Sequence, residues 1–297
     1  MWETQISVLI LRKREHRHRC ATIERMTPGE RFEVSVDGAV LAGERWSDGE
    51  PPIVLCHAGV ADRRSWRALA PLLADVGGVV ALDRRGFGET PPAREPFSHA
   101  ADLVAALKAL DAGPAWLVGS SMGAGVALDA ALEAPERVAG LVLFATAVSG
   151  QPDADDALDP DTERIDAALG ATEDPDEVNR LEAWLWLDGP TVPEGRVQGP
   201  ERELFEAMNA IVIAHERDEV SDGASGVDAW SRLGELQVPI TVAWGTLDVP
   251  QTIVESAAAA AQIPGAQTIV IEDAAHLSYL ERPAEAAAVV RAALSRA

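Results

Sequence analysis

The chain has 297 residues, of which 47% are hydrophobic and 25% charged, with two cysteines and a formal net charge of −23. This length suits one large α/β domain or a core domain with a smaller insertion, and the composition excludes a fibre, a disulfide scaffold and wholesale disorder. The negative charge argues against nucleic acid or a membrane as a partner, because phosphate-rich surfaces bind positive ones. A small-molecule substrate is the expected partner, and the sequence leaves the oligomeric state open.

The N-terminal segment differs in charge from the rest of the chain. Its first 25 residues carry six Lys/Arg against three Glu. The apolar run Ile6 to Leu11 precedes the basic run Arg12 to Arg19, which reverses the order found in a signal peptide. No run approaches the roughly 18 apolar residues of a membrane span. We therefore expect residues 1–25 to form a disordered basic extension, and the protein to be cytoplasmic.

From about residue 31, short β-branched runs alternate with longer Ala/Leu-rich stretches, which indicates βα units that build a mostly parallel sheet. Eight strands are predicted: Phe32–Val36, Ala39–Glu44, Ile53–Cys56, Val79–Leu82, Ala115–Val118, Leu141–Ala145, Ile240–Trp244 and Thr268–Ile271. Helices are predicted near 64–75, 98–111, 122–133, 252–261 and 283–296. Near-continuous apolar runs are typical of strands that are buried on both faces of the sheet.

The βα rhythm stops at about residue 149 and resumes near Leu236. Between these points, residues 150–225 hold 21 acidic against 5 basic side chains, so this segment carries most of the negative charge. Its apolar spacing and its Gly-Pro breaks predict helices around 160–169, 174–187 and 201–219. A helical insertion into the α/β core is therefore expected here.

The five residues Gly119-Ser120-Ser121-Met122-Gly123 fit the pattern G-x-S-x-G. They stand between a predicted strand and a predicted helix, where a sharp turn projects its apex residue clear of the sheet. Flanking glycines avoid collisions in such a strained turn. The apex is Ser121 and not Ser120. We predict Ser121 as a catalytic nucleophile, with an ordinary Gly/Ser turn as the alternative.

A serine hydroxyl needs a base within hydrogen-bond reach, and one of the six histidines is placed to supply it. His276 follows the last predicted strand through a short turn, at the carboxyl end of the sheet where α/β active sites form. Asp248 follows the penultimate strand and is the candidate acid that orients the imidazole. Asp273 is a weaker candidate because it lies too close to His276 in the chain. The predicted triad is Ser121, His276 and Asp248.

Four further segments are similar to motifs of the α/β-hydrolase superfamily, and the resemblance spans nearly all of residues 31–297. They are Cys56-His57-Ala58-Gly59 with Trp66, similar to an oxyanion segment; Asp83 to Thr90, similar to D-x-R-G-x-G-x-S; Gly245 to Pro250, similar to the acid loop G-x-x-D-x-x-P; and His276 to Pro283, similar to H-x(4)-E-R-P. The chain resembles the serine hydrolases of this superfamily, among them carboxylesterases and enol-lactonases. Ala58 and Ala275 depart from the pattern, because the family has glycine at both positions.

The resemblance implies an α/β-hydrolase fold, with a mostly parallel eight-stranded sheet, flanking helices and an inserted helical cap. The cap is expected at 149–230, and the core at 26–148 and 231–297. The resemblance also implies an oxyanion hole formed by the backbone N–H groups of Gly59 and Met122, and a structural role for His57. Candidates for a substrate pocket in the cap are Trp184, Trp186, Leu187, Phe205 and Met208, although internal packing is the commoner role of such side chains.

The predicted function is a cofactor-free hydrolase without a metal, which cleaves a carboxylic ester or lactone of a small neutral substrate through an acyl-enzyme. The acidic insertion disfavours multiply anionic substrates. Hydrolysis of a carbon–carbon bond, or perhydrolysis, by the same triad is an alternative. A ligand receptor that keeps the fold without catalysis is an alternative of another class.

Overall fold

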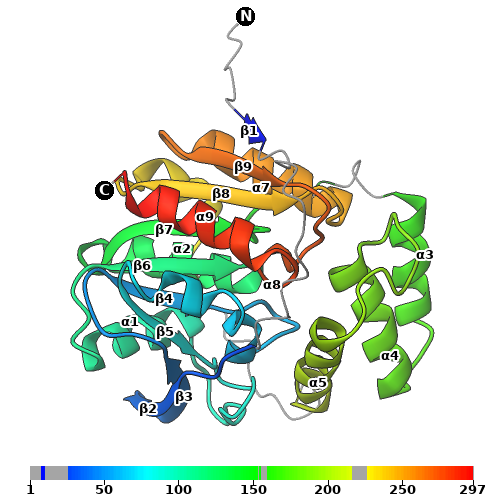
Figure 1. Cartoon of the computed structure of the whole chain (residues 1–297), viewed down its shortest axis with the longest axis horizontal. Helices are drawn as coiled ribbons and strands as arrows, with labels where there is room; N and C mark the ends of the chain where they lie inside the picture. The colour runs from blue at the N-terminus through cyan, green and yellow to red at the C-terminus, as the bar shows by residue number, and fades with distance from the viewer. Residues whose placement is uncertain (1–7, 11–25, 153, 155–158, 216–225, 297) are drawn as a thin grey trace, which may run out of the picture.

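The computed structural model describes residues 8–10, 26–152, 154, 159–215 and 226–296 (Figure 1). Its centre is a sheet with strand order β1-β9-β8-β7-β6-β4-β5-β3-β2. The strands are β1 (Val8–Ile10), β2 (Glu30–Val36), β3 (Ala39–Arg45), β4 (Pro52–Cys56), β5 (Gly78–Leu82), β6 (Ala115–Ser120), β7 (Val138–Phe144), β8 (Ile240–Gly245) and β9 (Gln267–Ile271). Neighbouring strands are parallel, except that β3 is antiparallel to both β2 and β5.

The eight predicted strands are all present, and the mostly parallel sheet is confirmed. A ninth strand was not predicted. Strand β1 lies within the predicted N-terminal extension, and it pairs in parallel with β9 at the edge of the sheet. The other residues of that extension lie outside the described part of the chain. The short apolar run before Arg12 is the sequence feature that matches this additional edge strand.

The helices of the core are α1 (His99–Ala109), α2 (Met122–Glu133), α6 (Ala229–Arg232), α7 (Pro250–Gln262), α8 (Ser278–Glu281) and α9 (Pro283–Leu294). The helix expected at 64–75 is instead two separate 3₁₀ turns, Arg63–Trp66 and Ala70–Leu73. Pro71 is the second residue of the second turn, and its missing N–H prevents a continuous helix through this stretch. The four-residue helix α8 was not predicted.

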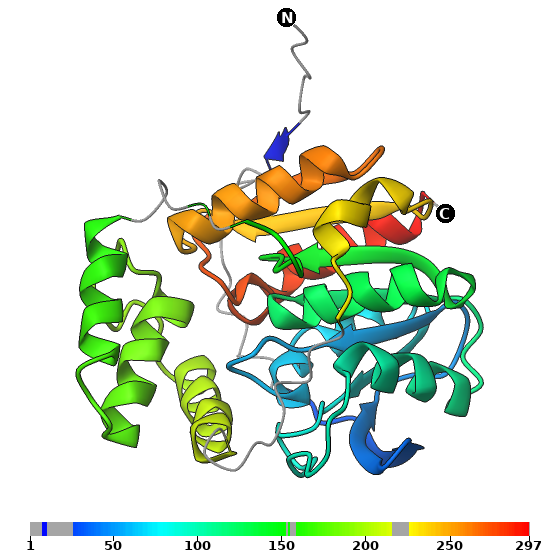
Figure 2. The same ribbon diagram turned by 180° about the vertical axis from the view of Figure 1, so that it is seen from behind.

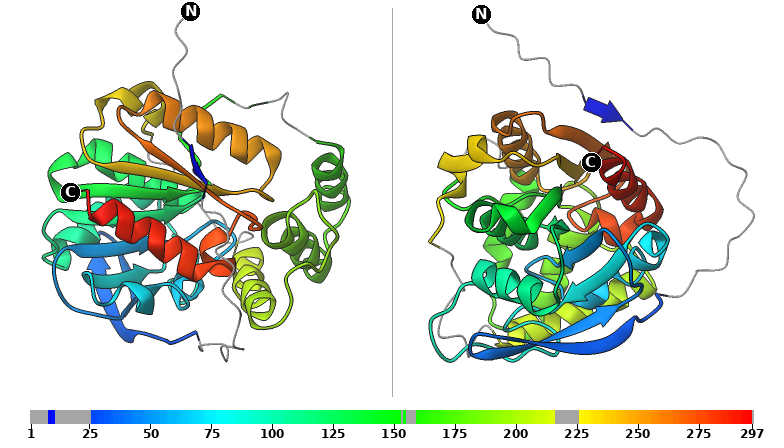
Figure 3. Two further views of the ribbon diagram at one scale, coloured as in Figure 1. Left: turned by 45° about the horizontal axis from the view of Figure 1, so that its top comes forward. Right: turned by 90° about the vertical axis from the view of Figure 1, so that its left-hand side faces the viewer.

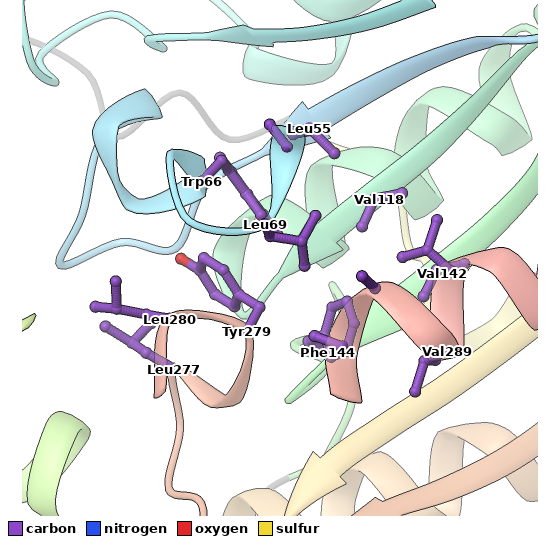
Figure 4. Packing of buried hydrophobic residues seen from close by; sticks show 14 of the residues in the cluster. Leu55, Trp66, Leu69, Val118, Val142, Phe144, Leu277, Tyr279, Leu280 and Val289 are labelled. Atoms are coloured by element: carbon purple, nitrogen blue, oxygen red, sulfur yellow. The ribbon is translucent and has the colours of Figure 1, made fainter. Parts of the chain in front are cut away.

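Alternate side chains of the central strands enter two hydrophobic clusters, one on each face of the sheet. In β4, Ile53 and Leu55 join one cluster while Val54 and Cys56 join the other. The first cluster is covered by α9 and the 3₁₀ turns, and Figure 4 shows its aromatic centre around Trp66, Phe144 and Tyr279. Helices α1, α2 and α7 cover the second cluster, on the face seen in Figure 2. Burial on both faces explains why the strand sequences are nearly all apolar.

Three further helices stand beside the sheet, on the side to which β6 and β8 point (Figures 1 and 3). They are α3 (Pro160–Leu169), α4 (Pro175–Glu182), which continues into a π-helical turn η5 (Ala183–Asp188), and α5 (Pro200–His215). We call residues 159–215 the cap. The predicted third helix extended to residue 219, and its last four residues lie outside the described chain. Within that described chain, no helix is both long enough and apolar enough to cross a membrane.

Candidate active site

Ser121 occupies the turn between β6 and α2. Its backbone has φ 52° and ψ −120°, a strained conformation that non-glycine residues rarely adopt. Its N–H donates to the carbonyl oxygen of Phe144 at the end of the neighbouring strand β7, over 2.8 Å. Ser120 is fully buried in β6, whereas Ser121 is partly exposed. The turn therefore presents Ser121 at the carboxyl end of the sheet, as the sequence pattern predicts.

The glycines on either side of Ser121 are required by close packing. A Cβ atom at Gly123 would overlap the carbonyl oxygens of Cys56 and His57 at the end of β4. A Cβ atom at Gly119 would lie 2.5 Å from the carbonyl oxygen of Gly123. These contacts leave no room for a side chain, so the start of α2 sits directly against β4.

His276 and Asp248 meet at the ends of the adjacent strands β9 and β8. His276 Nδ1 lies 2.9 Å from Asp248 Oδ1, and the two residues are only 4% and 1% exposed. Because Asp248 Oδ1 accepts, Nδ1 carries the proton and Nε2 is left with a lone pair. The N–H of Val249 donates to the same carboxylate oxygen over 2.8 Å. A buried imidazole oriented by a carboxylate can act as a general base.

Ser121 follows β6, which is separated from β8 by β7 alone. All three candidate triad residues therefore leave the sheet at the same edge. In the described chain, no hydrogen bond joins Ser121 Oγ to the His276 ring. Such bonds are often long in ligand-free enzymes and shorten when substrate binds.

Gly59 and Met122, the candidate oxyanion donors, are neighbours in space. A Cβ atom at Gly59 would lie 3.8 Å from both the Cβ and the Sδ of Met122. Among the described residues, neither backbone N–H donates a hydrogen bond to another group. Met122 is the first residue of α2, where the helix dipole favours negative charge. The Arg84 guanidinium lies 3.3 Å from Met122 Sδ and adds a buried positive charge beside these donors.

His57 is fully buried and holds the loop after β4. Its Nδ1 lies 2.9 Å from the carbonyl oxygen of Ala58, and its Nε2 accepts from the backbone N–H of Arg84 over 3.2 Å. Burial, together with the charge of Arg84, holds the pKa of His57 well below its usual range, so the ring is neutral. The Arg84 side chain also donates to the carbonyl oxygens of His57 and Ala58. These contacts support a structural role for His57.

The five pocket candidates in the cap are placed in different surroundings. Leu187, Phe205 and Met208 are fully buried in the same cluster as the core residues of α9, so they pack the cap against the core. Trp184 donates its indole N–H to the carbonyl oxygen of Val192 within the cap. Trp186 is partly buried, and its ring centroid lies 4.7 Å from that of His276. Of the five, Trp186 is therefore the residue in contact with the candidate triad.

Sequence reasoning missed two charged residues that contact the loop leading to His276. Glu281 accepts from the N–H of Ala275 over 2.8 Å, and it pairs with Arg196 of the cap. Glu281 belongs to the H-x(4)-E-R-P segment, so the motif marked its position without indicating a partner. Nothing in the cap sequence distinguished Arg196 from its other arginines. Among the residues that the structure describes, no group of three or more His, Cys, Asp and Glu side chains is arranged to hold a metal ion.

The fold is that of an α/β hydrolase. A family model described as "alpha/beta hydrolase fold" matches residues 51–283, and the chain belongs to this family. The 2-hydroxymuconate semialdehyde hydrolase of Pseudomonas sp. strain CF600 is 30% identical over 80% of this chain and 85% of its own length. The dihydrolipoyllysine-residue acetyltransferase component of the acetoin cleaving system of Pseudomonas putida is 32% identical over 80% of this chain. The match spans 62% of that relative, which is less than two thirds of its length.

Solved structures with similar folds also include α/β hydrolases. A thermophilic esterase from Thermogutta terrifontis superposes with a TM-score of 0.71 at 27% identity, over 90% of this chain and 99% of the esterase. Est816, described as an N-acyl homoserine lactone degrading enzyme, superposes with a TM-score of 0.69 at 26% identity, over 88% of this chain and 99% of its own. The similar proteins thus include an esterase, a lactone-degrading enzyme and a hydrolase of a semialdehyde.

Proposed function

We propose that the protein hydrolyses a carboxylic ester or lactone of a small neutral substrate through the triad Ser121, His276 and Asp248. Ser121 Oγ attacks the substrate carbonyl while His276 Nε2 takes the hydroxyl proton. The alcohol leaves with that proton, and the acyl group stays on Ser121. His276 then takes a proton from a water molecule, which attacks the acyl-enzyme and releases the acid.

Backbone groups and buried charges complete the proposed mechanism. The backbone N–H groups of Gly59 and Met122 form the proposed oxyanion hole, in which each donor stabilises the transition state by about 3–4 kcal/mol. Asp248 holds the imidazole in the tautomer with its proton on Nδ1 and stabilises the imidazolium that forms. No step calls for a cofactor.

The strained backbone of Ser121 is the observation that carries the proposal. A serine at φ 52° costs on the order of 1–3 kcal/mol, and the surrounding packing of Gly119 and Gly123 enforces it. A Gly/Ser turn without a catalytic role has no need of this strain. The buried pair of His276 and Asp248 at the same sheet edge supplies the base.

The similar proteins support two classes of reaction. The esterase and the lactone-degrading enzyme favour an acyl–oxygen bond as the target. The 2-hydroxymuconate semialdehyde hydrolase favours carbon–carbon bond hydrolysis as the second candidate, with the same triad. The cap holds 14 acidic against 4 basic side chains, and this excess of negative charge argues against multiply anionic substrates in both cases.

A substrate panel tests the proposal. Purified wild type and Ser121→Ala are assayed with short-chain p-nitrophenyl esters, lactones, thioesters and vinylogous diketones. We expect ester or lactone turnover by the wild type and a loss of about 10⁴-fold or more in kcat for the variant. Turnover of the diketones alone would favour the second candidate. Equal rates for the two proteins would contradict the mechanism.

A further inference from the structure

Residues 186–197 of the cap contact His276 and the loops that carry His276 and Asp248. Resting on the function proposed above, we propose that this segment is a positioning element, which holds His276 through Trp186, Gly189 and the ion pair of Arg196 with Glu281. In this proposal the cap has a second role besides covering the site. It sets the orientation of the base on which each proton transfer depends.

The first contact is made by an aromatic ring. Trp186 lies in the turn η5, and its ring meets the His276 imidazole at a centroid distance of 4.7 Å and an interplanar angle of 48°. Asp248 fixes one edge of the imidazole through Nδ1. The indole restricts rotation about that hydrogen bond, because a tilted ring at this distance fills the space into which the imidazole would turn.

The second contact reaches the backbone just before His276. Glu281 accepts from the N–H of Ala275 with one carboxylate oxygen, and its other oxygen receives the guanidinium of Arg196. The Glu281 side chain is only 4% exposed, whereas that of Arg196 is 22% exposed. Arg196 also reaches the carbonyl oxygen of Asp273 over 3.4 Å. The cap arginine therefore holds the His276 loop both directly and through Glu281.

The third contact reaches the loop that carries Asp248. Gly189 ends η5 with φ +93°, and a Cβ atom there would overlap the carbonyl oxygen of Leu247. Leu247 directly precedes Asp248, and its N–H donates to the carbonyl oxygen of Ala274 over 2.9 Å. The cap backbone thus lies against the acid loop, which is itself bonded to the His276 loop.

The segment that makes these contacts is itself held in place. Asp188 is fully buried, and its carboxylate accepts from the N–H groups of Gly195 and Val197 over 2.7 and 2.8 Å. These two residues flank Arg196 in the chain. Arg202 of α5 balances the charge of the same carboxylate. Arg196 donates to the carbonyl oxygens of Leu187 and Asp188 as well, so its guanidinium has a fixed position when it reaches Glu281.

A groove of about 450 Å³ runs along this seam and exposes it to solvent. Charged groups of both signs line the groove: Arg196 and Glu201 of the cap, and Asp273, Glu281 and Arg282 of the core. Burial raises the pKa of Glu281 to about 7, against the opposing effects of Arg196, the Ala275 N–H and Arg282. Glu281 therefore changes charge near neutral pH, and the ion pair with Arg196 is complete only above that value.

The test compares variants of the ion pair with a matched cap arginine. Arg180 forms ion pairs with Glu177 and Glu194 on the cap surface, so Arg180→Met removes an equivalent cap interaction away from His276. Arg196→Met and Glu281→Gln are measured beside it for kcat, KM and the rate of labelling by a fluorophosphonate. We expect kcat and the labelling rate to fall about 10- to 100-fold for the ion-pair variants, with KM within about twofold, and to stay near wild type for Arg180→Met.

The pH profile separates positioning from mere stability. Removal of the Arg196 charge raises the pKa of Glu281 further, so the acid limb of kcat is expected to move to higher pH in Arg196→Met. Arg196→Lys keeps a positive charge near Glu281 and should restore most of the rate. Trp186→Phe keeps an aromatic ring and should be milder than Trp186→Ala. These conservative variants give a result even where Arg196→Met folds poorly.

Two outcomes overturn the inference and are distinct from a failure of the proposed function. Wild-type kcat and an unshifted pH profile in folded Arg196→Met and Glu281→Gln would contradict positioning by this pair. Equal losses in Arg180→Met would show a general effect of cap stability instead. A wild-type protein that is not labelled by the fluorophosphonate would contradict the proposed function itself, because that reaction needs an activated serine and no particular substrate.

Discussion

The turn around Ser121 and the loop around His276 are held in different ways. Backbone packing within the core fixes the first: Gly119 and Gly123 leave no room for a side chain, and the Ser121 N–H bonds to the neighbouring strand. Side chains from the cap hold the second, through partners as distant in sequence as Arg196 and Glu281, 85 residues apart. Nucleophile geometry is thus a property of the core alone, whereas the orientation of the base depends on the docked cap.

The largest effect is expected from a change to Asp248, the candidate acid of the triad. Asp248→Asn removes the charge that stabilises the imidazolium and favours the wrong tautomer, so kcat should fall about 10⁴-fold. Steady-state assays with the best substrate of the panel measure it. Asp273→Asn is the matched control, because Asp273 is the weaker sequence candidate for the triad acid and asparagine tolerates its φ of 56°. If Asp273→Asn is the more damaging of the two, the acid has been misassigned.

The next largest effect is expected from a change in the turn that carries Ser121. Gly123→Ala forces a methyl group onto the carbonyl oxygens of Cys56 and His57, which are backbone atoms of a buried strand end. We expect a loss of about 3 kcal/mol or more in the free energy of unfolding, together with a loss of activity. Denaturant unfolding measures the difference from Gly113→Ala, a site where no atom lies within 4 Å of the added Cβ. Similar stabilities for the two variants would show that the turn accommodates the added methyl group without strain.

Gly189 of the cap allows the corresponding test for the region around His276. Gly189→Ala combines a positive φ with an overlap onto Leu247, whereas Gly199→Ala has φ +77° and open space around the new Cβ. Both variants carry the backbone penalty of about 1 kcal/mol, but only the first displaces the cap from the acid loop. We expect kcat to fall about tenfold or more in Gly189→Ala and to change less than twofold in Gly199→Ala. Equal kcat values in the two variants would show that the contact between the cap and the acid loop does not affect catalysis.

The stability of the protein is also expected to depend on pH through Glu281. The pKa of Glu281 is about 7 in the folded protein and 4.5 in the unfolded chain, so between these values only the folded state holds the proton. Its contribution to stability is therefore present near pH 4.5 and lost as pH rises through 7. Relative to Glu281→Gln, wild type should lose on the order of 2–3 kcal/mol of unfolding free energy from pH 5 to pH 8. Parallel pH curves would mean that Glu281 stays charged throughout.

Much of the core could be predicted from sequence because each element carries its own local signal. The central parallel strands are apolar runs, and Ser121 stands in a short pattern that is meaningful between a strand and a helix. The candidate acid and base follow strand ends, and parallel strands bring such ends to one edge. A conformation such as φ 52° at Ser121 follows from the same pattern.

The contacts of the cap could not be predicted in this way. From sequence, Leu187, Phe205 and Met208 were pocket candidates for which internal packing is the commoner role, and the docked arrangement shows them buried against the core. The partner of Arg196 depends on how the cap sits on the sheet, which no local pattern encodes. Strand β1 was missed because three residues give too short a signal beside a strongly basic run.

Labelling by a fluorophosphonate tests the central claim most directly, because it reports an activated serine without knowledge of the substrate. Intact-mass spectrometry of wild type should show a single adduct on Ser121. Ser121→Ala should show none, and His276→Ala should react far more slowly than wild type because the serine loses its base. An unlabelled wild type, or an adduct that persists in Ser121→Ala, would contradict the assignment of Ser121 as the nucleophile.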